Sequence, residues 1–224
     1  PQSCLRQLRR TQPERMPRRM TVAKAQSEQG SQFWDGGYTL VEGLLDETKL
    51  DFATRAIDAS DRQGVMRRRT DPFLELADDE YSPVFGEILL RHCRPRIEAV
   101  IGRPLLETCA YWRIYRAGSL LQPHRDRVAC EISATLTISS EPEGQAWPIF
   151  VEDLHGTEVP VTIPPGSGLV YQGAKVKHWR EPLPSGSHRQ LLLHYVLKDG
   201  RFRDHVFDKR DTDPIMRRAA SESD

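Results

Sequence analysis

Glu131-Ile-Ser-Ala-Thr-Leu-Thr-Ile-Ser139 is the stretch that decides the fold class, because apolar residues occupy every second position along it. Such alternation is typical of a β-strand that buries one face. Runs of the same kind predict further strands, and turn-forming Gly and Pro residues separate them. The predicted strands cover 109–116, 131–139, 148–151, 159–163, 168–171 and 188–197.

Helical patterns precede these strands. A short strand is expected over 38–41, followed by Asp46 as the N-cap of a helix whose apolar stripe includes Leu50 and Ile57. A second helix is expected over 84–101, ended by Gly102 and kinked or split by Pro95. The pattern predicts an α+β, mainly β chain: a double-stranded β-helix (jelly roll) with N-terminal helices packed on one sheet.

Composition limits the classes of partner. The 224 residues fit one domain with tails: a disordered Arg-rich tail over 1–32, the domain over 33–207 and a polar tail over 208–224. The formal net charge of +0 gives no argument for nucleic acid, and no apolar run is long enough for a membrane helix. Four cysteines without a CxxC pair, and no secretory signal, predict a cytoplasmic protein. The oligomeric state stays open.

The segment His124-Arg-Asp126 carries the first chemical signal. On an extended segment, His124 and Asp126 point to the same side and can share one metal ion. His178 follows much later, after a predicted strand, and completes two imidazoles and one carboxylate. Such a set suits non-haem Fe(II), with positions left open for a co-substrate and oxygen. Arg189 begins an apolar strand, where its fork suits a carboxylate.

These residues, together with Pro165-Gly166, resemble the Fe(II)/2-oxoglutarate-dependent dioxygenases, in particular the prolyl-4-hydroxylase-like branch. The resemblance implies that His124, Asp126 and His178 bind the catalytic Fe(II). It further implies that Arg189 pairs with the distal carboxylate of the co-substrate 2-oxoglutarate, that O2 is consumed, and that succinate and CO2 are released. Tyr115 looks like the tyrosine whose hydroxyl joins that carboxylate contact. Thr135 and Thr137 share a strand face and are expected to line the same pocket.

Two further arginines are candidates for substrate contacts. Arg180 shares a strand face with His178 and competes with Arg189 for 2-oxoglutarate or binds a substrate carboxylate, whereas Arg127 is expected to touch a polar substrate. The expected reaction is hydroxylation of an unactivated C–H bond in a small polar metabolite or amino-acid-like molecule. The resemblance further implies that Asp126 favours oxygenation over halogenation. The alternatives are a peptidyl (prolyl-type) hydroxylase and a non-catalytic cupin-like binding protein, although the chain has no His-x-His pair.

Overall fold

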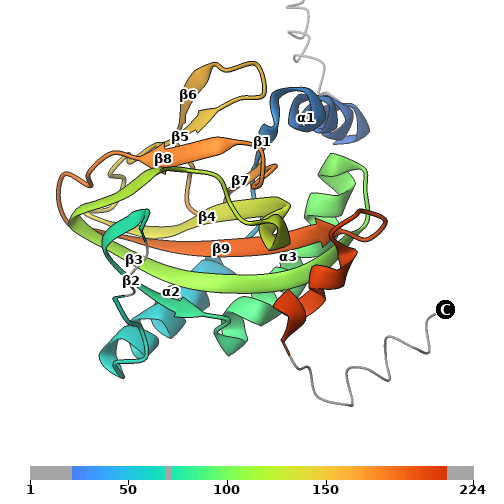
Figure 1. The fold of residues 1–224 in the computed structure, drawn as a ribbon. Helices are drawn as coiled ribbons and strands as arrows, with labels where there is room; N and C mark the ends of the chain where they lie inside the picture. The colour runs from blue at the N-terminus through green and yellow to red at the C-terminus, as the bar shows by residue number, and fades with distance from the viewer. Residues whose placement is uncertain (1–21, 69–71, 211–224) are drawn as a thin grey trace, which may run out of the picture.

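A nine-stranded antiparallel sheet, curled into a half-barrel, is the frame of the molecule (Figure 1). The computed structural model describes residues 22–68 and 72–210. Neighbouring strands follow the order β1-β7-β4-β9-β3-β8-β5-β6, and β2 pairs with β3. The strands are β1 Tyr38–Val41, β2 Leu74–Tyr81, β3 Leu105–His124, β4 Ile132–Glu141, β5 Ile149–Glu152, β6 Glu158–Val161, β7 Gly168–Tyr171, β8 Lys177–Arg180 and β9 Ser187–Leu197.

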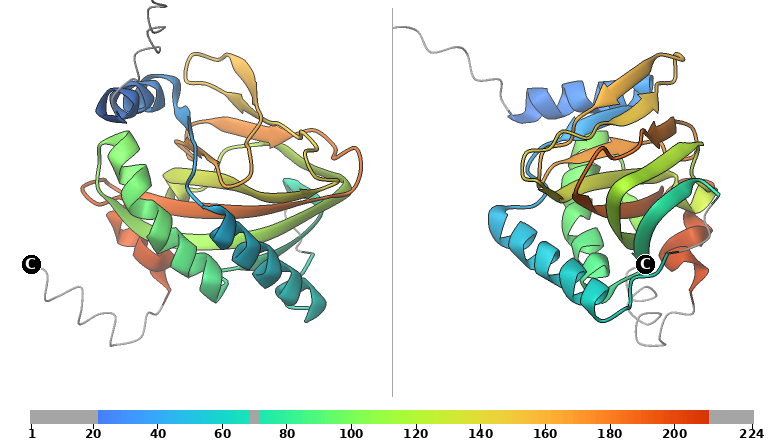
Figure 2. Two further views of the ribbon diagram at one scale, coloured as in Figure 1. Left: turned by 180° about the vertical axis from the view of Figure 1, so that it is seen from behind. Right: turned by 90° about the vertical axis from the view of Figure 1, so that its left-hand side faces the viewer.

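Helices cover one face of this sheet. Figure 2 shows α2 and α3 lying across the outer side of the β9 and β4 strands, while α1 lies at one end of the sheet. The jelly-roll architecture with helices on one sheet is therefore confirmed. The helices are α1 Val22–Gly36, α2 Glu47–Arg62 and α3 Val84–Ile101, with short 3-10 turns at η1 Val128–Cys130 and η2 Arg203–Lys209.

The two faces of strand β9 meet different surroundings: one face packs against the helices, and the other faces the inside of the half-barrel. Leu191, Leu193 and Tyr195 belong to the large apolar core that the helices share with the sheet. The Tyr195 hydroxyl donates to the carbonyl of Leu90 in α3 at 2.7 Å, which ties the helix to the strand. Side chains at the alternate positions, such as Gln190, face the opposite side, toward the interior of the half-barrel.

The long strand β3 joins the two parts of the half-barrel. Its first part, from Leu105 to Arg116, pairs with β9, and its last part pairs with β8. A register shift lies between Leu121 and His124, close to the end of the strand. Because β3 serves both neighbours, residues at its end stand opposite β8 rather than β9.

Several boundaries differ from those expected from sequence. Helix α1 occupies residues 22–36, a stretch partly assigned to a disordered tail, and β2 forms where no element was expected.

Helix α3 runs as one helix through Pro95, and Gly102 ends it in the left-handed conformation at φ +70°, as predicted. Asp46 caps α2 by accepting from the Lys49 amide at 2.9 Å. The tail residues 1–21 and 211–224 lie outside the described residues.

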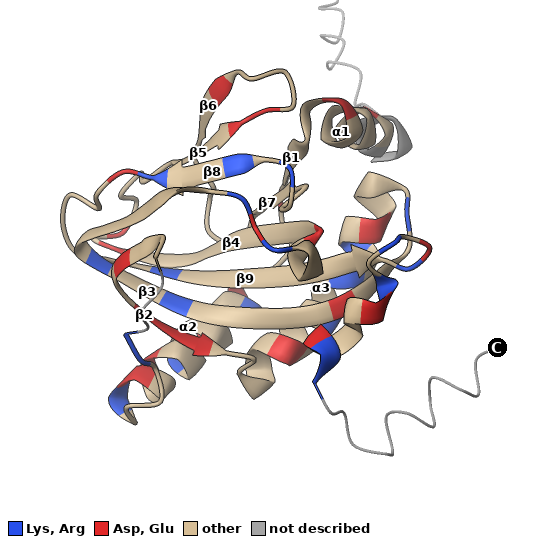
Figure 3. Cartoon of the chain, viewed as in Figure 1, with Lys and Arg blue, Asp and Glu red and all other residues tan. Residues whose placement is uncertain are grey.

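Charge is spread over the molecule. Figure 3 shows acidic and basic residues interleaved along the helices and strands, in keeping with the balanced composition. Within the described ranges, no helix combines the length and the apolar character needed to cross a membrane.

Candidate metal centre

Three side chains with metal-binding atoms meet where β3 ends beside β8. His124 is the last residue of β3, and its partner in the antiparallel register is His178 of β8. Asp126 follows in the turn, where its backbone N–H donates to the carbonyl of Gly173 at 2.9 Å. One ligand atom from each of the three residues lies within 4.8 Å of the others. The structure thus brings together the three residues predicted as metal ligands.

Backbone hydrogen bonds determine which nitrogen of each histidine is available. The Nδ1 of His124 lies 2.9 Å from the carbonyl oxygen of Gln122, and the Nδ1 of His178 lies 3.1 Å from that of Val176. A carbonyl only accepts, so each Nδ1 carries the proton and each Nε2 keeps its lone pair. The two Nε2 atoms lie 3.6 and 3.7 Å from Oδ1 of Asp126. Two ligands at about 2.1 Å from one ion stand at most about 4.2 Å apart, so both pairs fit a shared metal.

The two carboxylate oxygens of Asp126 have different partners. Oδ1 faces the histidines, while Oδ2 accepts from the Ser133 hydroxyl at 2.7 Å. Burial by itself would raise the pKa of Asp126, but the nearby His178, His124 and Ser133 hold it well below its usual range. A Cβ at Gly173 would stand 2.6 Å from Oδ2, so only glycine fits there. Asp126 is held as an anion with one oxygen directed to the metal position.

A cavity of about 390 Å³ adjoins the three ligands. Burial lowers the pKa of His178 in its wall, which keeps that imidazole neutral and able to bind a metal. The buried Tyr115 also lines this cavity, and its hydroxyl accepts from Nη1 of Arg113 at 3.2 Å. Of the other residues predicted for the site, Arg127, Thr135 and Arg180 line the same cavity.

Arg180 is the strongest anion-binding group in the cavity wall. It lies two residues beyond His178 in β8, so both side chains point to the interior, and it is only 2% exposed. Its Nη1 donates to the carbonyl of Trp147, and the guanidinium carbon stands 4.4 Å from the centre of that indole ring. Its Nε and Nη2 are buried without a hydrogen-bond partner among the described residues. Burial lowers the pKa of Arg180 to about 10. A buried cation with two unused donors requires an anion.

Arg189 is not among the residues that line this cavity, so the structure does not bring it to the predicted metal ligands. Its Nε donates to Asp58 of α2 at 2.7 Å, and its Nη1 donates to Glu141 at 2.9 Å. Alternation correctly puts Arg189 on one face with Leu191, but that face packs against the helices.

Two other candidates have different outcomes. Thr135 lines the cavity and accepts from the amide of Gln190. Thr137, two residues further along β4, lines a second cavity of about 470 Å³ and not the cavity beside the metal-binding side chains. Arg127 lines the cavity, but its guanidinium also binds both carboxylate oxygens of Asp208 in η2.

Sequence reasoning missed other polar residues of the cavity. Arg113 shares the inward face of β3 with Tyr115, so the alternation of that strand carried the signal. Its guanidinium stands 3.5 Å from the carboxylate of Asp79, which comes from the unpredicted strand β2. His194 shares the inward face of β9 with Gln190, and the same alternation would have revealed it.

Comparisons with known proteins rest on structure alone. No family model matches the sequence, and no curated protein matches it. A solved structure of the epimerase SnoN, in complex with Fe3+, alpha ketoglutarate and nogalamycin RO, superposes with a TM-score of 0.65 at 15% identity. That match covers 85% of this chain and 93% of SnoN.

Two further solved structures have the same fold. A prolyl-4-hydroxylase from Pseudomonas putida gives a TM-score of 0.60 at 13% identity and covers 76% of this chain and 97% of the other. HygX from Streptomyces hygroscopicus, with nickel, 2-oxoglutarate and hygromycin B bound, gives 0.58 at 12% identity and covers 77% and 87%. The chain has the fold of these three proteins.

Proposed function

We propose that the protein is an Fe(II)- and 2-oxoglutarate-dependent oxygenase that hydroxylates an unactivated C–H bond of a small polar or amino-acid-like molecule. One observation carries this proposal. Two histidines and one aspartate bring one ligand atom each within 4.8 Å of one another, and one of these histidines, His178, lies two residues from the buried Arg180 with its two unused donors. The fold shared with proteins solved in complex with metal and 2-oxoglutarate supports it.

The donor set fits Fe(II). Two neutral imidazoles and a carboxylate bind one face of an octahedral ion and leave the other face for exchangeable ligands. The Nδ1 hydrogen bonds of His124 and His178 hold both rings in the orientation needed. The anionic Asp126 offsets part of the positive charge of the metal.

Arg180 fits the distal carboxylate of 2-oxoglutarate. Its Nε and Nη2 offer the fork that a carboxylate accepts from two donors. Its place two residues from His178 is about 6–7 Å along the strand, which suits a five-carbon diacid whose other end reaches the metal. Tyr115 and Thr135 line the same cavity and add hydroxyl groups.

The chemistry divides between the bound groups and the chain. When bound, iron and 2-oxoglutarate supply the oxidising power of O2 for C–H cleavage, with succinate and CO2 as co-products. The chain's residues hold the metal in a fixed orientation and neutralise the co-substrate's carboxylate away from water. The buried walls from β3, β4, β8 and β9 keep bulk solvent from the reacting carbon.

A small polar substrate is favoured by the cavity wall. Beyond the groups assigned to metal and co-substrate, the wall carries the buried Arg113–Asp79 ion pair, with 9% and 3% of the side chains exposed. Peptidyl hydroxylation is the second candidate, because a prolyl hydroxylase solved with a peptide fragment shares the fold at a TM-score of 0.58. Free Cys93, Cys109 and Cys130 support a reducing compartment such as the cytoplasm.

An anaerobic titration tests the proposal. We expect Fe(II) to bind first and 2-oxoglutarate to bind only after it, with the visible charge-transfer absorption of an Fe(II)–2-oxo acid chelate. The His178→Ala variant should bind neither. Binding of 2-oxoglutarate that ignores the metal would contradict the proposal, and a chelate that never yields succinate with O2 would indicate a binding protein.

The substrate class needs a second measurement. Incubation of the loaded enzyme with a metabolite extract, and separately with a proteolytic peptide mixture, is followed by mass spectrometry for gain of one oxygen atom. Products confined to the peptide arm would favour the peptidyl hydroxylase.

A further inference from the structure

Ser133 has one hydroxyl proton and three nearby atoms that could accept it. Its Oγ lies 2.7 Å from Oδ2 of Asp126, 3.2 Å from the carbonyl of Cys130 and 3.0 Å from Nδ1 of His194. A carboxylate and a carbonyl only accept, so both oxygens compete for the single proton. The charged carboxylate at the shortest distance takes it. Ser133 therefore has only lone pairs left for His194.

This arrangement fixes the protons of His194. Because Ser133 accepts toward the ring, Nδ1 of His194 must carry a proton and donate it. The pKa of His194 is lowered to about 4, mainly by burial; Arg127 and Arg113 act in the same direction, and Asp126 acts in the opposite direction. The neutral ring then has its proton on Nδ1, and Nε2 keeps its lone pair.

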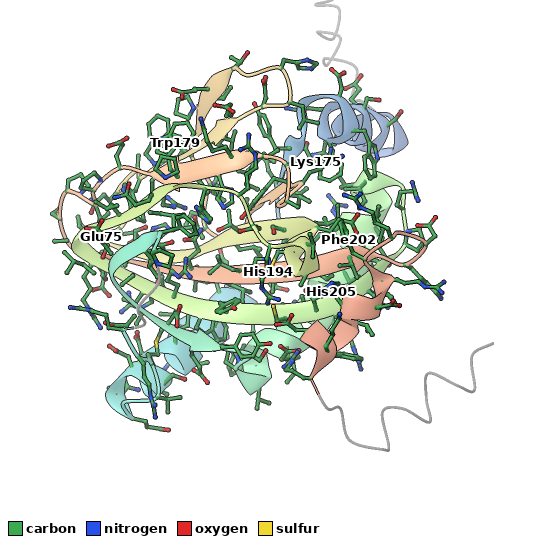
Figure 4. All side chains as sticks on the ribbon, viewed as in Figure 1. Glu75, Lys175, Trp179, His194, Phe202 and His205 are labelled. Carbon is green, nitrogen blue, oxygen red and sulfur yellow. The ribbon has the colours of Figure 1, made fainter. Side chains whose placement is uncertain are left out.

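The Nε2 atom of His194 faces the cavity. The side chain is 4% exposed and lines the cavity beside the metal ligands, on the inward face of β9 (Figure 4 labels it). Its only hydrogen bond among the described residues is the one from Nδ1. Nε2 is absent from the fully buried unpaired atoms, so the cavity still reaches it. The edge-on ring of Tyr111, 5.8 Å between centroids, packs against the imidazole.

We propose that His194 is a specificity-determining residue whose Nε2 accepts a hydrogen bond from an N–H or O–H group of the molecule that is oxidised. This inference rests on the proposed oxygenase function. Ser133 joins Asp126 to Nδ1 of His194, and His194 lines the same cavity as the three metal-binding side chains, so the donor of the substrate belongs in the cavity where the reacting carbon would lie. The substrate class is therefore amines, secondary amides and alcohols, in preference to ethers, tertiary amides and hydrocarbons.

The preference should be large because a pocket built around an acceptor penalises a ligand that leaves the acceptor unpaired. We expect at least about a tenfold difference in affinity between a donor-bearing ligand and its methylated analogue. A purely structural role of His194, through Ser133 alone, predicts no such difference.

Two variants separate the two nitrogens of His194. His194→Asn places an amide N–H near the position of Nδ1, which preserves donation to Ser133 and removes the acceptor in the cavity. His194→Gln places its amide near Nε2, which restores an acceptor and removes the donor to Ser133. Ser133→Ala removes the link to Asp126 and serves as the control for metal positioning.

The experiment uses the full chain loaded with Zn(II), a redox-inert substitute, and 2-oxoglutarate. Long-range 1H–15N NMR spectra give the protonated nitrogen of His194, with His194→Asn for assignment. The probes are two matched pairs, 2-pyrrolidinone with N-methyl-2-pyrrolidinone and cyclohexanol with methoxycyclohexane, and their binding is followed by ligand-observed NMR.

The expected result is a proton on Nδ1 and at least about tenfold tighter binding of 2-pyrrolidinone and cyclohexanol than of their methylated partners. His194→Asn should abolish that preference, and His194→Gln should keep part of it. A proton on Nε2, equal or absent binding of both members of each pair, or an unchanged preference in His194→Asn overturns the inference. Binding of Zn(II) and of 2-oxoglutarate is measured separately by calorimetry. If the protein binds neither, the result contradicts the oxygenase proposal and not the role of His194.

Discussion

Replacing Arg180 by alanine should weaken 2-oxoglutarate binding far more than replacing Arg189. Arg180 offers two buried, unused donors, Nε and Nη2, to an incoming carboxylate. Hydrogen bonds to charged groups contribute about 1.5–3 kcal/mol each, and two that share one fork give about 3–4 kcal/mol. At about 1.4 kcal/mol per tenfold, the dissociation constant should rise by two to three orders of magnitude.

The assay is calorimetric titration of 2-oxoglutarate into Zn(II)-loaded protein, with metal affinity measured first in each variant. Arg180→Lys keeps the charge but loses the fork, so it should recover only part of the affinity. Arg189→Ala is the matched control, because its partners Asp58 and Glu141 lie outside the cavity. A change below about threefold in Arg180→Ala, or a larger loss in Arg189→Ala, would refute the assignment of Arg180.

Three further predictions concern the metal centre and its surroundings. His178→Ala should reduce metal affinity by at least about a hundredfold, because one of three ligands is lost; calorimetry with Fe(II) or Zn(II) measures it, and retained affinity would remove His178 from the ligand set. Gly173→Ala should lower metal affinity and the melting temperature, since its Cβ would stand 2.6 Å from Oδ2 of Asp126, whereas Gly36→Ala meets nothing within 4 Å and should match the parent. Burial lowers the pKa of His194 from 6.5 to about 4, so its neutral form stabilises the fold fully above pH 6.5 and loses that contribution as the pH falls to 4. Between pH 6.5 and pH 4, the free energy of unfolding of the metal-free parent should therefore fall by about 3 kcal/mol more than that of metal-free His194→Gln. Urea titrations at each pH measure both values, and parallel pH profiles of the two proteins would contradict the prediction.

Local pattern was enough to locate the metal ligands. The spacing of His124 and Asp126 brings both to one side of an extended segment, and the strand before His178 was recognisable. The same rule put Arg180 on the face of His178, but the position of Arg189 at the start of an apolar strand made Arg189 the preferred candidate. Alternation tells which side chains share a face and leaves open which face meets the helices.

Arg189 shows why that choice needs tertiary information. Its position at the start of an apolar strand is costly unless an anion compensates it, and the anion is Asp58 in α2, far away in sequence. Helix α2 was predicted and expected to pack on a sheet, but the sequence did not show that Asp58 would meet Arg189, so the carboxylate of the co-substrate was chosen as the partner.

The missed elements depend on contacts between distant segments. Helix α1 has little apolar character along most of its length, and the side chain of Trp34 near its end donates to the carbonyl of Ile101 in α3 at 2.8 Å. Strand β2 is rich in acids and lacks alternation, and its pairing with β3 defines it. Sequence patterns predict an element where its apolar residues are buried at regular spacing. Helix α1 and strand β2 lack such a pattern, and their structure depends on contacts with neighbouring elements.

The cross-strand pair of His124 and His178 makes metal loading part of assembly. Strand β8 is short, and it connects β3 to the β5–β6 hairpin. An ion held from both strands fastens that outer portion to the rest of the sheet, and its binding energy adds to the free energy of unfolding as RT ln(1 + [M]/Kd). Amides of β8 and β5 should therefore exchange fastest in the metal-free chain. The free energy of unfolding of the protein therefore depends on the concentration of free metal around it.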